Sequence, residues 1–301
     1  MNHAPRLPQD IDEVVARALA EDLGAGDVTA ELVSADAQVD AFVVAREPAV
    51  ICGGPWFEAV FRKIDPAVKV KWDFGETLSV KAEQQVCRVQ GSARAILTGE
   101  RTALNFLQML SGVATQTRRF VERVRGTKVK IVDTRKTVPG LRAAQKYAVL
   151  CGGGSNHRMG LYDAILIKEN HIAAAGTMTK AIEKARALHP KLPLMAEAEN
   201  IEEVKEGLDG KLDVLLLDDF PTHLLSKAVA MAQEYRRYNR AHTLIEASGG
   251  VNLNNVRDIA DTGVDRISIG SLTKNVQAID LSMRFTPEVE EKRAGKRAGV
   301  S

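Results

Sequence analysis

Six short apolar segments recur along the second half of the chain, and each is followed directly by charged or small polar residues. Segments with helix-like patterns separate them. Strands that alternate with helices predict a parallel sheet, and six in succession predict an α/β barrel or a doubly wound sheet. In both architectures the carboxyl ends of the strands meet at one face, where binding sites are built. The expected strands cover residues 130–132, 164–167, 192–196, 214–217, 243–245 and 266–269.

The first 125 residues follow a different pattern. Apolar residues at helical spacing predict a helix over 11–23. From 94 to 125 the pattern is helical again, and Ser111-Gly112 is expected to divide this stretch into two helices. A small α+β region therefore precedes the repeated units. Its expected strands cover 41–45, 68–72, 79–82 and 86–89.

Composition limits the function classes. The 301 residues carry 41 Lys plus Arg against 39 Asp plus Glu, a net charge of +2, so neither a nucleic-acid nor a membrane partner is expected. No run of 18 apolar residues occurs, and the N-terminus becomes acidic before a long apolar run develops, so neither a membrane span nor a signal peptide is predicted. Three cysteines without a spacing motif suggest neither disulfides nor a zinc site, and indicate a reducing, cytoplasmic location.

Residues 134–158 concentrate positive charge in this nearly neutral chain. The stretch contains Arg135, Lys136, Arg142, Lys146, His157 and Arg158, and no Asp or Glu. A solvated helix face is the usual reason for such a run. Here the cluster begins directly after an expected buried strand and lacks interleaved acids, which favours a ligand with several anionic groups. Arg142 and Lys146 are expected only at the rim of such a site or as structural braces. His157, taken by itself, is as compatible with a structural role as with a chemical one.

Further polar groups are expected on the same face. The Gly152–Gly154 run could be a flexible turn, but we interpret it as a ligand loop that offers backbone N–H groups to an anion. Glu197 and Asp218 follow successive strands; they could be ion-pair partners of Lys168, or they could hold Mg²⁺ and substrate hydroxyls, which we favour. Glu199 is a weaker candidate.

Two small-residue motifs follow the last two expected strands. They are Ser248-Gly249-Gly250 and Gly270-Ser271, and either alone could be a turn. Together, in consecutive βα units, they predict a pocket for a 5′-phosphate.

Several segments together resemble the quinolinate phosphoribosyltransferases, a group of type II phosphoribosyltransferases also called carboxylating nicotinate-nucleotide pyrophosphorylases. The resemblance covers nearly the whole chain. It lies in EDLGAGDVT, TGERTALNFLQMLSGVAT, DTRKTVPGLR, KYAVLCGGGSNHRMGLYDAILIKENHI, EAEN, LLLDDF, EASGGV and ISIGSLT, in that order. It implies an N-terminal α/β sandwich domain over 1–112, completed by the C-terminal segment 275–301, and an incomplete α/β barrel of parallel strands over 113–274.

The resemblance also implies an activity and a set of site residues. The activity is transfer of a phosphoribosyl group from phosphoribosyl pyrophosphate to quinolinate with decarboxylation, for NAD biosynthesis, with Mg²⁺ as cofactor. In the family's homodimer, Arg101 would reach into the site of the partner chain. The resemblance does not decide between a dimer and a higher oligomer. Arg135, Lys136, His157, Arg158 and Lys168 would bind substrate anions; Lys136, Lys168, Glu197 and Asp218 are the catalytic candidates. Glu197 and Asp218 would hold Mg²⁺ directly or through water or substrate, and Ser248, Gly249, Gly250, Gly270 and Ser271 would bind the 5′-phosphate.

One position departs from the family pattern. Asp219 stands where Asn is expected, which adds a negative charge. Two alternatives to the implied activity stay open at this stage: a related enzyme that uses another pyridine or base, and a non-catalytic sensor of phosphorylated metabolites. Turnover in a substrate panel separates the three.

Overall fold

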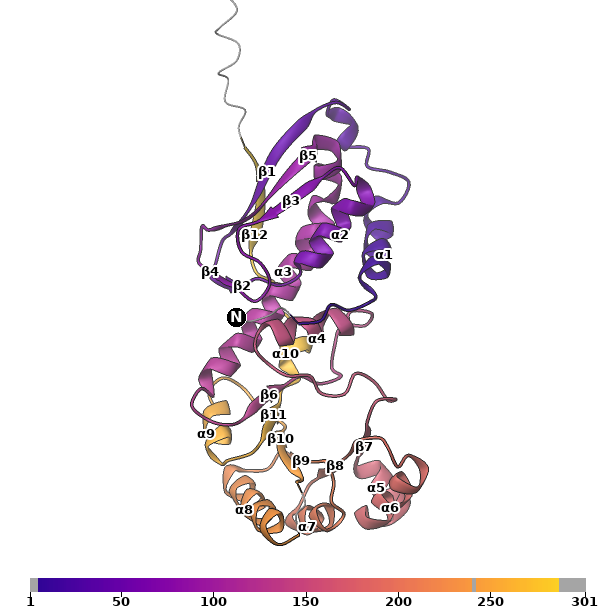
Figure 1. Ribbon diagram of the computed structural model, residues 1–301, viewed down its shortest axis with the longest axis vertical. Coiled ribbons are helices and arrows are strands. Elements are labelled where there is room, and N and C mark those ends of the chain that lie inside the picture. The colour runs from indigo at the N-terminus through magenta and orange to yellow at the C-terminus, as the bar shows by residue number, and fades with distance from the viewer. Residues whose placement is uncertain (1–4, 240–241, 287–301) are drawn as a thin grey trace, which may run out of the picture.

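The N-terminal part of the chain forms an antiparallel sheet that the far end of the chain completes. The computed structural model describes residues 5–239 and 242–286, and in it the strand order is β12-β1-β5-β3. The last strand pairs antiparallel with β1 across the top of the molecule (Figure 1). Residues 287–301 of the expected C-terminal segment lie outside the described residues. These strands are β1 Gln38–Ala45, β3 Lys69–Trp72, β5 Gln85–Ser92 and β12 Leu281–Phe285, and a separate pair comprises β2 Ala49–Val50 and β4 Ser79–Val80.

Helices pack against this sheet and exclude water from its inner face. In α2, Pro55 stands in the first turn, where its missing N–H costs no helical hydrogen bond. The helix buries Trp56, Phe57 and Phe61, and Phe57 meets Phe61 edge to face with ring centroids 5.1 Å apart. Aromatic side chains therefore form the centre of this core. The N-terminal helical elements are α1 Ile11–Leu23, the 3₁₀ turn η1 Ala30–Leu32, α2 Gly54–Ile64 and α3 Ala93–Arg123.

One continuous helix, α3, runs from the sheet region to the barrel (Figure 1). The predicted break at Ser111-Gly112 is therefore wrong. Both residues are buried inside the helix, and a Cβ atom at Gly112 would lie 2.1 Å from the Gln277 carbonyl oxygen. The glycine serves close packing against the returning C-terminal segment, and that packing offsets the cost of about 1 kcal/mol that glycine imposes on a helix.

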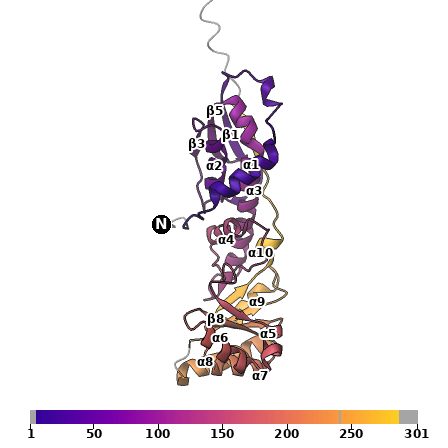
Figure 2. The same ribbon diagram turned by 90° about the vertical axis from the view of Figure 1, so that its right-hand side faces the viewer.

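The second half of the described chain forms a six-stranded parallel sheet. Its order is β6-β11-β10-β9-β8-β7, so β6 and β7 are the two edges and do not pair with each other. The sheet therefore makes an incomplete α/β barrel at the lower end of the elongated molecule (Figure 2). The strands are β6 Lys130–Val132, β7 Ile165–Ile167, β8 Leu194–Ala198, β9 Val214–Asp218, β10 Leu244–Ser248 and β11 Arg266–Ser268.

Buried apolar runs produce these strands, and helices cover their outer side. Residues 214–217 of β9 are all buried, as parallel strands covered on both faces require. The structure extends β8 and β10 two and three residues beyond the predicted ends, so Glu197 and Ser248 lie within strands. Within residues 5–239 and 242–286, no helix combines the length and apolarity needed to cross a membrane. The helices are α4 Arg142–Cys151, α5 Glu169–Ala175, α6 Met178–Leu188, α7 Ile201–Asp209, α8 Thr222–Asn239, α9 Val256–Asp261 and α10 Ser271–Lys274.

Candidate active site

A cavity of about 350 Å³ opens at the carboxyl ends of the parallel strands. In parallel register Asp218 lies opposite Ser248, so the ends of β9 and β10 contribute to it side by side. This is the location at which α/β barrels build their sites. The cavity is lined by Thr134, Arg135, Lys136, His157, Arg158, Leu166, Lys168, Glu197, Leu216, Asp218, Glu246, Ser248 and Ser268.

Cations form one wall of the cavity. Arg135 and Lys136 follow β6, Arg158 lies beyond α4, and Lys168 directly follows β7. Within the described residues, the buried Nε of Arg135 has no hydrogen-bond partner. Burial lowers the pKa of Arg158, and the charge of Arg135 lowers it further. An anionic ligand would supply acceptors for Arg135 and relieve the repulsion between the two guanidinium groups.

The carboxylates of Glu197 and Asp218 line the same cavity. The Nζ of Lys168 donates to Glu197 Oε1 at 2.5 Å, so Glu197 forms the ion pair that the alternative interpretation proposed. Asp218, at the end of β9, is exposed, and within the described part of the chain it has no ion-pair partner. The Lys168–Glu197 pair is exposed enough that water weakens it, so it can rearrange when a ligand enters.

The floor of the cavity is a buried polar network. His157 Nε2 lies 3.7 Å from Glu246 Oε1, and Arg266 Nε lies 2.9 Å from Glu246 Oε2. His157 Nδ1 accepts a hydrogen bond from the Arg158 backbone N–H at 2.8 Å. This bond assigns the ring proton to Nε2, which faces Glu246. Burial lowers the pKa of His157 to about 4, and the charge of Arg266 contributes, so the imidazole is neutral near pH 7.

A second buried pair holds the same loop from below. The side chains of Lys146 and Asp133 form an ion pair and are 1% and 0% exposed. Lys146 Nζ also donates to the His157 carbonyl oxygen at 3.0 Å, and the His157 N–H donates to Asp133 Oδ1 at 2.8 Å. Lys146 is therefore a brace for the segment that carries His157 and Arg158, one of the two roles expected for it.

The expected 5′-phosphate residues lie at the adjoining end of the sheet. Gly249 has φ +91°, and a Cβ there would lie 2.1 Å from Asp219 Oδ1, so only glycine fits. Asp219 itself has φ +54°, a conformation that Asn and Asp tolerate best among residues with side chains. Ser248 lines the cavity, whereas Gly249 and Gly250 lie in the adjoining loop, Gly270 caps α10 and Ser271 is its first residue.

The expectation that the Gly152–Gly154 N–H groups bind an anion is wrong, although His157 and Arg158, which follow the glycines, do line the cavity. The three N–H groups donate to the carbonyl oxygens of Ala148, Leu150 and Val149, so they end α4 and are not free for a ligand. A Cβ at Gly152 would lie 2.5 Å from the Ala114 carbonyl oxygen, and one at Gly154 would lie 2.8 Å from Thr117. The glycines let α4 pack closely on α3, and the ligand-facing groups come later, at His157 and Arg158.

Three other candidates lie outside the cavity lining. Arg101 is exposed on α3. Arg142 braces a loop, with its Nη1 donating to the Met159 carbonyl oxygen at 3.1 Å. Glu199 is exposed beyond the end of β8 and does not join Glu197 at the cavity.

Sequence reasoning missed Asp133, Glu246 and Arg266. Each is an ionisable residue in or beside a short apolar strand, and such residues are rarely buried without a charged partner. An ionisable residue in or beside an otherwise apolar strand is therefore the sequence feature that could have identified them. It could not show that Glu246 and Arg266 pair with each other across neighbouring strands, because pairing depends on the register of the sheet.

The arrangement suits a reaction that separates charge. Cations at one wall can hold carboxylates or phosphates, while Glu197 and Asp218 can stabilise a developing positive charge. The neutral His157 can donate or accept a hydrogen bond without adding charge.

Comparisons with known proteins all indicate the same family. Residues 27–111 match the family described as quinolinate phosphoribosyl transferase, N-terminal domain, and residues 113–284 match its C-terminal domain. A nicotinate-nucleotide pyrophosphorylase [carboxylating] of Mycobacterium leprae is 42% identical, with 90% of this chain and 95% of that protein aligned. A probable enzyme of the same name from Synechocystis is 40% identical, over 91% and 92%. The solved nicotinate-nucleotide pyrophosphorylase of Francisella tularensis superposes with a TM-score of 0.89 at 41% identity, covering 95% of this chain and all of that one.

Proposed function

Since the chain belongs to the quinolinate phosphoribosyltransferase family, we propose that it transfers the 5-phosphoribosyl group of phosphoribosyl pyrophosphate to quinolinate. The products are nicotinate mononucleotide, pyrophosphate and CO₂, and the reaction belongs to de novo NAD biosynthesis. One observation carries the proposal: one cavity brings together a group of cations, among them Arg135 with a buried nitrogen that has no hydrogen-bond partner within the described residues, and the two carboxylates of Glu197 and Asp218.

The cationic wall binds the substrate anions. Arg135 and Arg158, with His157 beside them, hold the two carboxylates of quinolinate, because a guanidinium matches a carboxylate with two parallel hydrogen bonds. Lys136 and Lys168 lie toward the pyrophosphate of the second substrate. Two carboxylates on neighbouring ring carbons therefore distinguish quinolinate from pyridines that carry one.

The carboxylates act on the sugar. As the pyridine nitrogen attacks the anomeric carbon and pyrophosphate leaves, the ribose becomes electron-poor, and Glu197 and Asp218 stabilise it. Lys168 leaves its ion pair with Glu197 and neutralises the departing pyrophosphate. Once the ring nitrogen is quaternary, it stabilises the carbanion that remains when the adjacent carboxylate leaves as CO₂. The fixed Arg135 and Arg158 keep the ring oriented through both steps.

The acids also fit a divalent cofactor. Of the three acids that line the cavity, Glu246 is paired with Arg266, which leaves Glu197 and Asp218, too few for an all-protein cage. Mg²⁺ typically takes one or two carboxylates and completes its shell with water and substrate phosphates, so the pair is a suitable donor set. Mg²⁺ supplies charge neutralisation for the pyrophosphate when it is bound. The strand end, loop and helix start that carry Ser248, Gly249, Gly250, Gly270 and Ser271 hold the 5′-phosphate.

The proposed active site is shared between the two chains of a homodimer. Arg101 lies on the surface of α3 and outside this chain's own cavity, and we place it in the cavity of a partner chain within a cytoplasmic homodimer. Mixing an Arg101→Ala chain with a Lys168→Ala chain then restores partial activity through one hybrid site. Absence of any recovery, with heterodimers demonstrated by mass spectrometry, contradicts the shared site.

A substrate panel tests the activity itself. With phosphoribosyl pyrophosphate and Mg²⁺, the protein should turn over quinolinate and leave nicotinate and other single-carboxylate pyridines unreacted. Arg135→Ala should lower kcat/KM for quinolinate about 10- to 100-fold, the value of a charge-assisted hydrogen bond, while Lys184→Ala on α6 should not change it. Preference for nicotinate, or ligand binding without turnover by folded protein, contradicts the proposal.

A further inference from the structure

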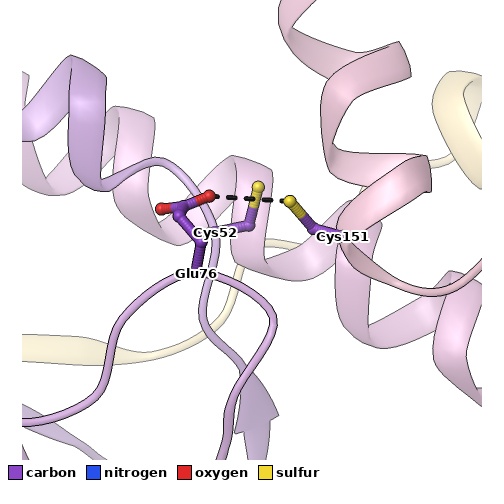
Figure 3. Close-up of side chains that lie close together, drawn as sticks. All are labelled: Cys52, Glu76 and Cys151. Atoms are coloured by element: carbon purple, nitrogen blue, oxygen red, sulfur yellow. Dashed lines mark hydrogen bonds between the residues drawn. The ribbon is translucent and has the colours of Figure 1, made fainter. Parts of the chain in front are cut away.

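Three ligand-type side chains converge between the N-terminal unit and the barrel unit, away from the cavity. They are Cys52, between β2 and α2, Glu76, between β3 and β4, and Cys151, the last residue of α4 (Figure 3). Their sulfur and oxygen atoms all lie within 4.8 Å of one another. The cysteines are far apart in the sequence, which is why no spacing motif signals them.

The backbone holds this cluster in place. Cys52 is fixed to α3, because its N–H donates to Ser111 Oγ at 3.0 Å and its carbonyl oxygen accepts from the same hydroxyl at 3.1 Å. Glu76 Oε1 accepts from the N–H groups of Gly53 and Gly54 at 3.0 and 2.7 Å. Its other oxygen, Oε2, faces the Cys151 thiol at 3.6 Å (Figure 3). A carboxylate anchored through one oxygen and directed through the other at a thiol is typical of metal ligands, which are themselves hydrogen-bonded.

A fourth polar group, the hydroxyl of Tyr147, belongs to the same buried cluster. Tyr147 lies one helical turn before Cys151 on α4 and is 2% exposed, and its hydroxyl lies beside the Glu76 carboxylate but makes no well-aligned hydrogen bond within the described residues. A buried hydroxyl without a well-aligned hydrogen bond is unfavourable, and an ion or ion-bound water in the cluster would satisfy it.

We propose that Cys52, Cys151 and Glu76 bind one zinc-type divalent ion, with the fourth position taken by the Tyr147 oxygen or by water held there. Two sulfurs and one carboxylate oxygen suit Zn²⁺ and exclude Mg²⁺ as the preferred ion. Each thiol loses its proton to solvent as its metal–sulfur bond forms. The positive charge of the ion offsets the burial that otherwise disfavours thiolates here. The atoms need to approach by only about 1 Å to reach tetrahedral zinc spacing.

The bound ion would join the two units of the fold. Cys52 and Glu76 belong to the N-terminal unit, whereas Cys151 ends the helix that leads to the His157–Arg158 segment. An ion that binds only the folded protein stabilises it, and the gain grows with the logarithm of its free concentration.

Cobalt spectroscopy on the full chain tests the site. After chelation and reduction with a phosphine, Co²⁺ is titrated in excess Mg²⁺, so that carboxylate sites are saturated. One equivalent should produce thiolate-to-cobalt charge-transfer absorption, and Zn²⁺ should displace it. Zn²⁺ alone should raise Tm, and its affinity should fall with pH because binding releases protons.

Matched variants locate the ligands. The band and the Tm shift should disappear in Cys52→Ala and Cys151→Ala and persist in Cys87→Ala, which removes the third buried thiol. Glu76→Gln keeps an acceptor for Gly53 and Gly54 and should bind Co²⁺ at least 10-fold more weakly while staying folded. Absence of the band in the intact protein, its persistence without Cys52 and Cys151, or formation of a Cys52–Cys151 disulfide in place of metal uptake overturns the proposal.

Discussion

Replacing Lys146 by Met should destabilise the protein strongly, because it leaves Asp133 as an unpaired buried charge. Both side chains are almost completely buried, at 1% and 0% exposure, and Lys146 also donates to the His157 carbonyl oxygen at 3.0 Å. Met fills a similar volume, so little of the cost comes from a cavity. Removing one partner of a buried pair costs about 3–5 kcal/mol, and we expect a loss in this range.

Urea unfolding followed by circular dichroism measures this loss. The control is the double variant Lys146→Met, Asp133→Asn, which removes both charges and keeps an oxygen to accept from the His157 N–H. It should recover most of the stability, since a neutral pair carries no uncompensated charge. A loss below about 1 kcal/mol in the single variant, or a larger loss in the double variant, refutes the assignment of this pair as a buried brace.

Three further predictions concern the site and the long helix. The pKa of His157 is lowered to about 4 from 6.5, so the unfolded state binds the extra proton between these values, and acidification from pH 6.5 to 4 should remove about 3 kcal/mol of the stability that depends on His157, measured as the difference between the intact protein and His157→Gln in urea unfolding. His157→Gln should lack this loss; the raised pKa of Asp133, about 6, acts with the opposite sign in both proteins and cancels in their difference. Asp219→Asn should lower KM for phosphoribosyl pyrophosphate in steady-state kinetics, because it removes a negative charge beside Gly249; an unchanged or higher KM contradicts a phosphate at that loop. Gly112→Ala should lower the free energy of unfolding by about 1–3 kcal/mol, because the added Cβ would lie 2.1 Å from the Gln277 carbonyl oxygen. The control, Gly75→Ala, has open space around its Cβ and should leave Tm in thermal melts unchanged.

The sequence allowed the repeated strand–helix pattern and most of the cavity lining to be predicted. The strand at 130–132 was predicted with its observed bounds, and the parallel arrangement follows from the alternation of strands with helices. The carboxyl-end rule then placed Arg135, Lys168 and Asp218 on one face, where the structure has them. Local pattern was sufficient because each of these residues lies at the carboxyl end of a strand or within three residues of it.

Long-range packing could not be predicted in the same way. Gly112 has the appearance of a helix break, and only the approach of Gln277 explains it. The same holds for Gly152, which packs against Ala114. The convergence of Cys52 and Cys151 likewise depends on how the two units pack, which no sequence spacing expresses.

The most direct test of the central claim follows both leaving groups at once. Quinolinate labelled at the carboxyl carbon next to the ring nitrogen is incubated with phosphoribosyl pyrophosphate, Mg²⁺ and the protein, and labelled CO₂ and pyrophosphate are counted together. The account predicts equal amounts of both, with nicotinate mononucleotide as the only nucleotide product. Pyrophosphate release without CO₂, or neither product from folded protein, would contradict it.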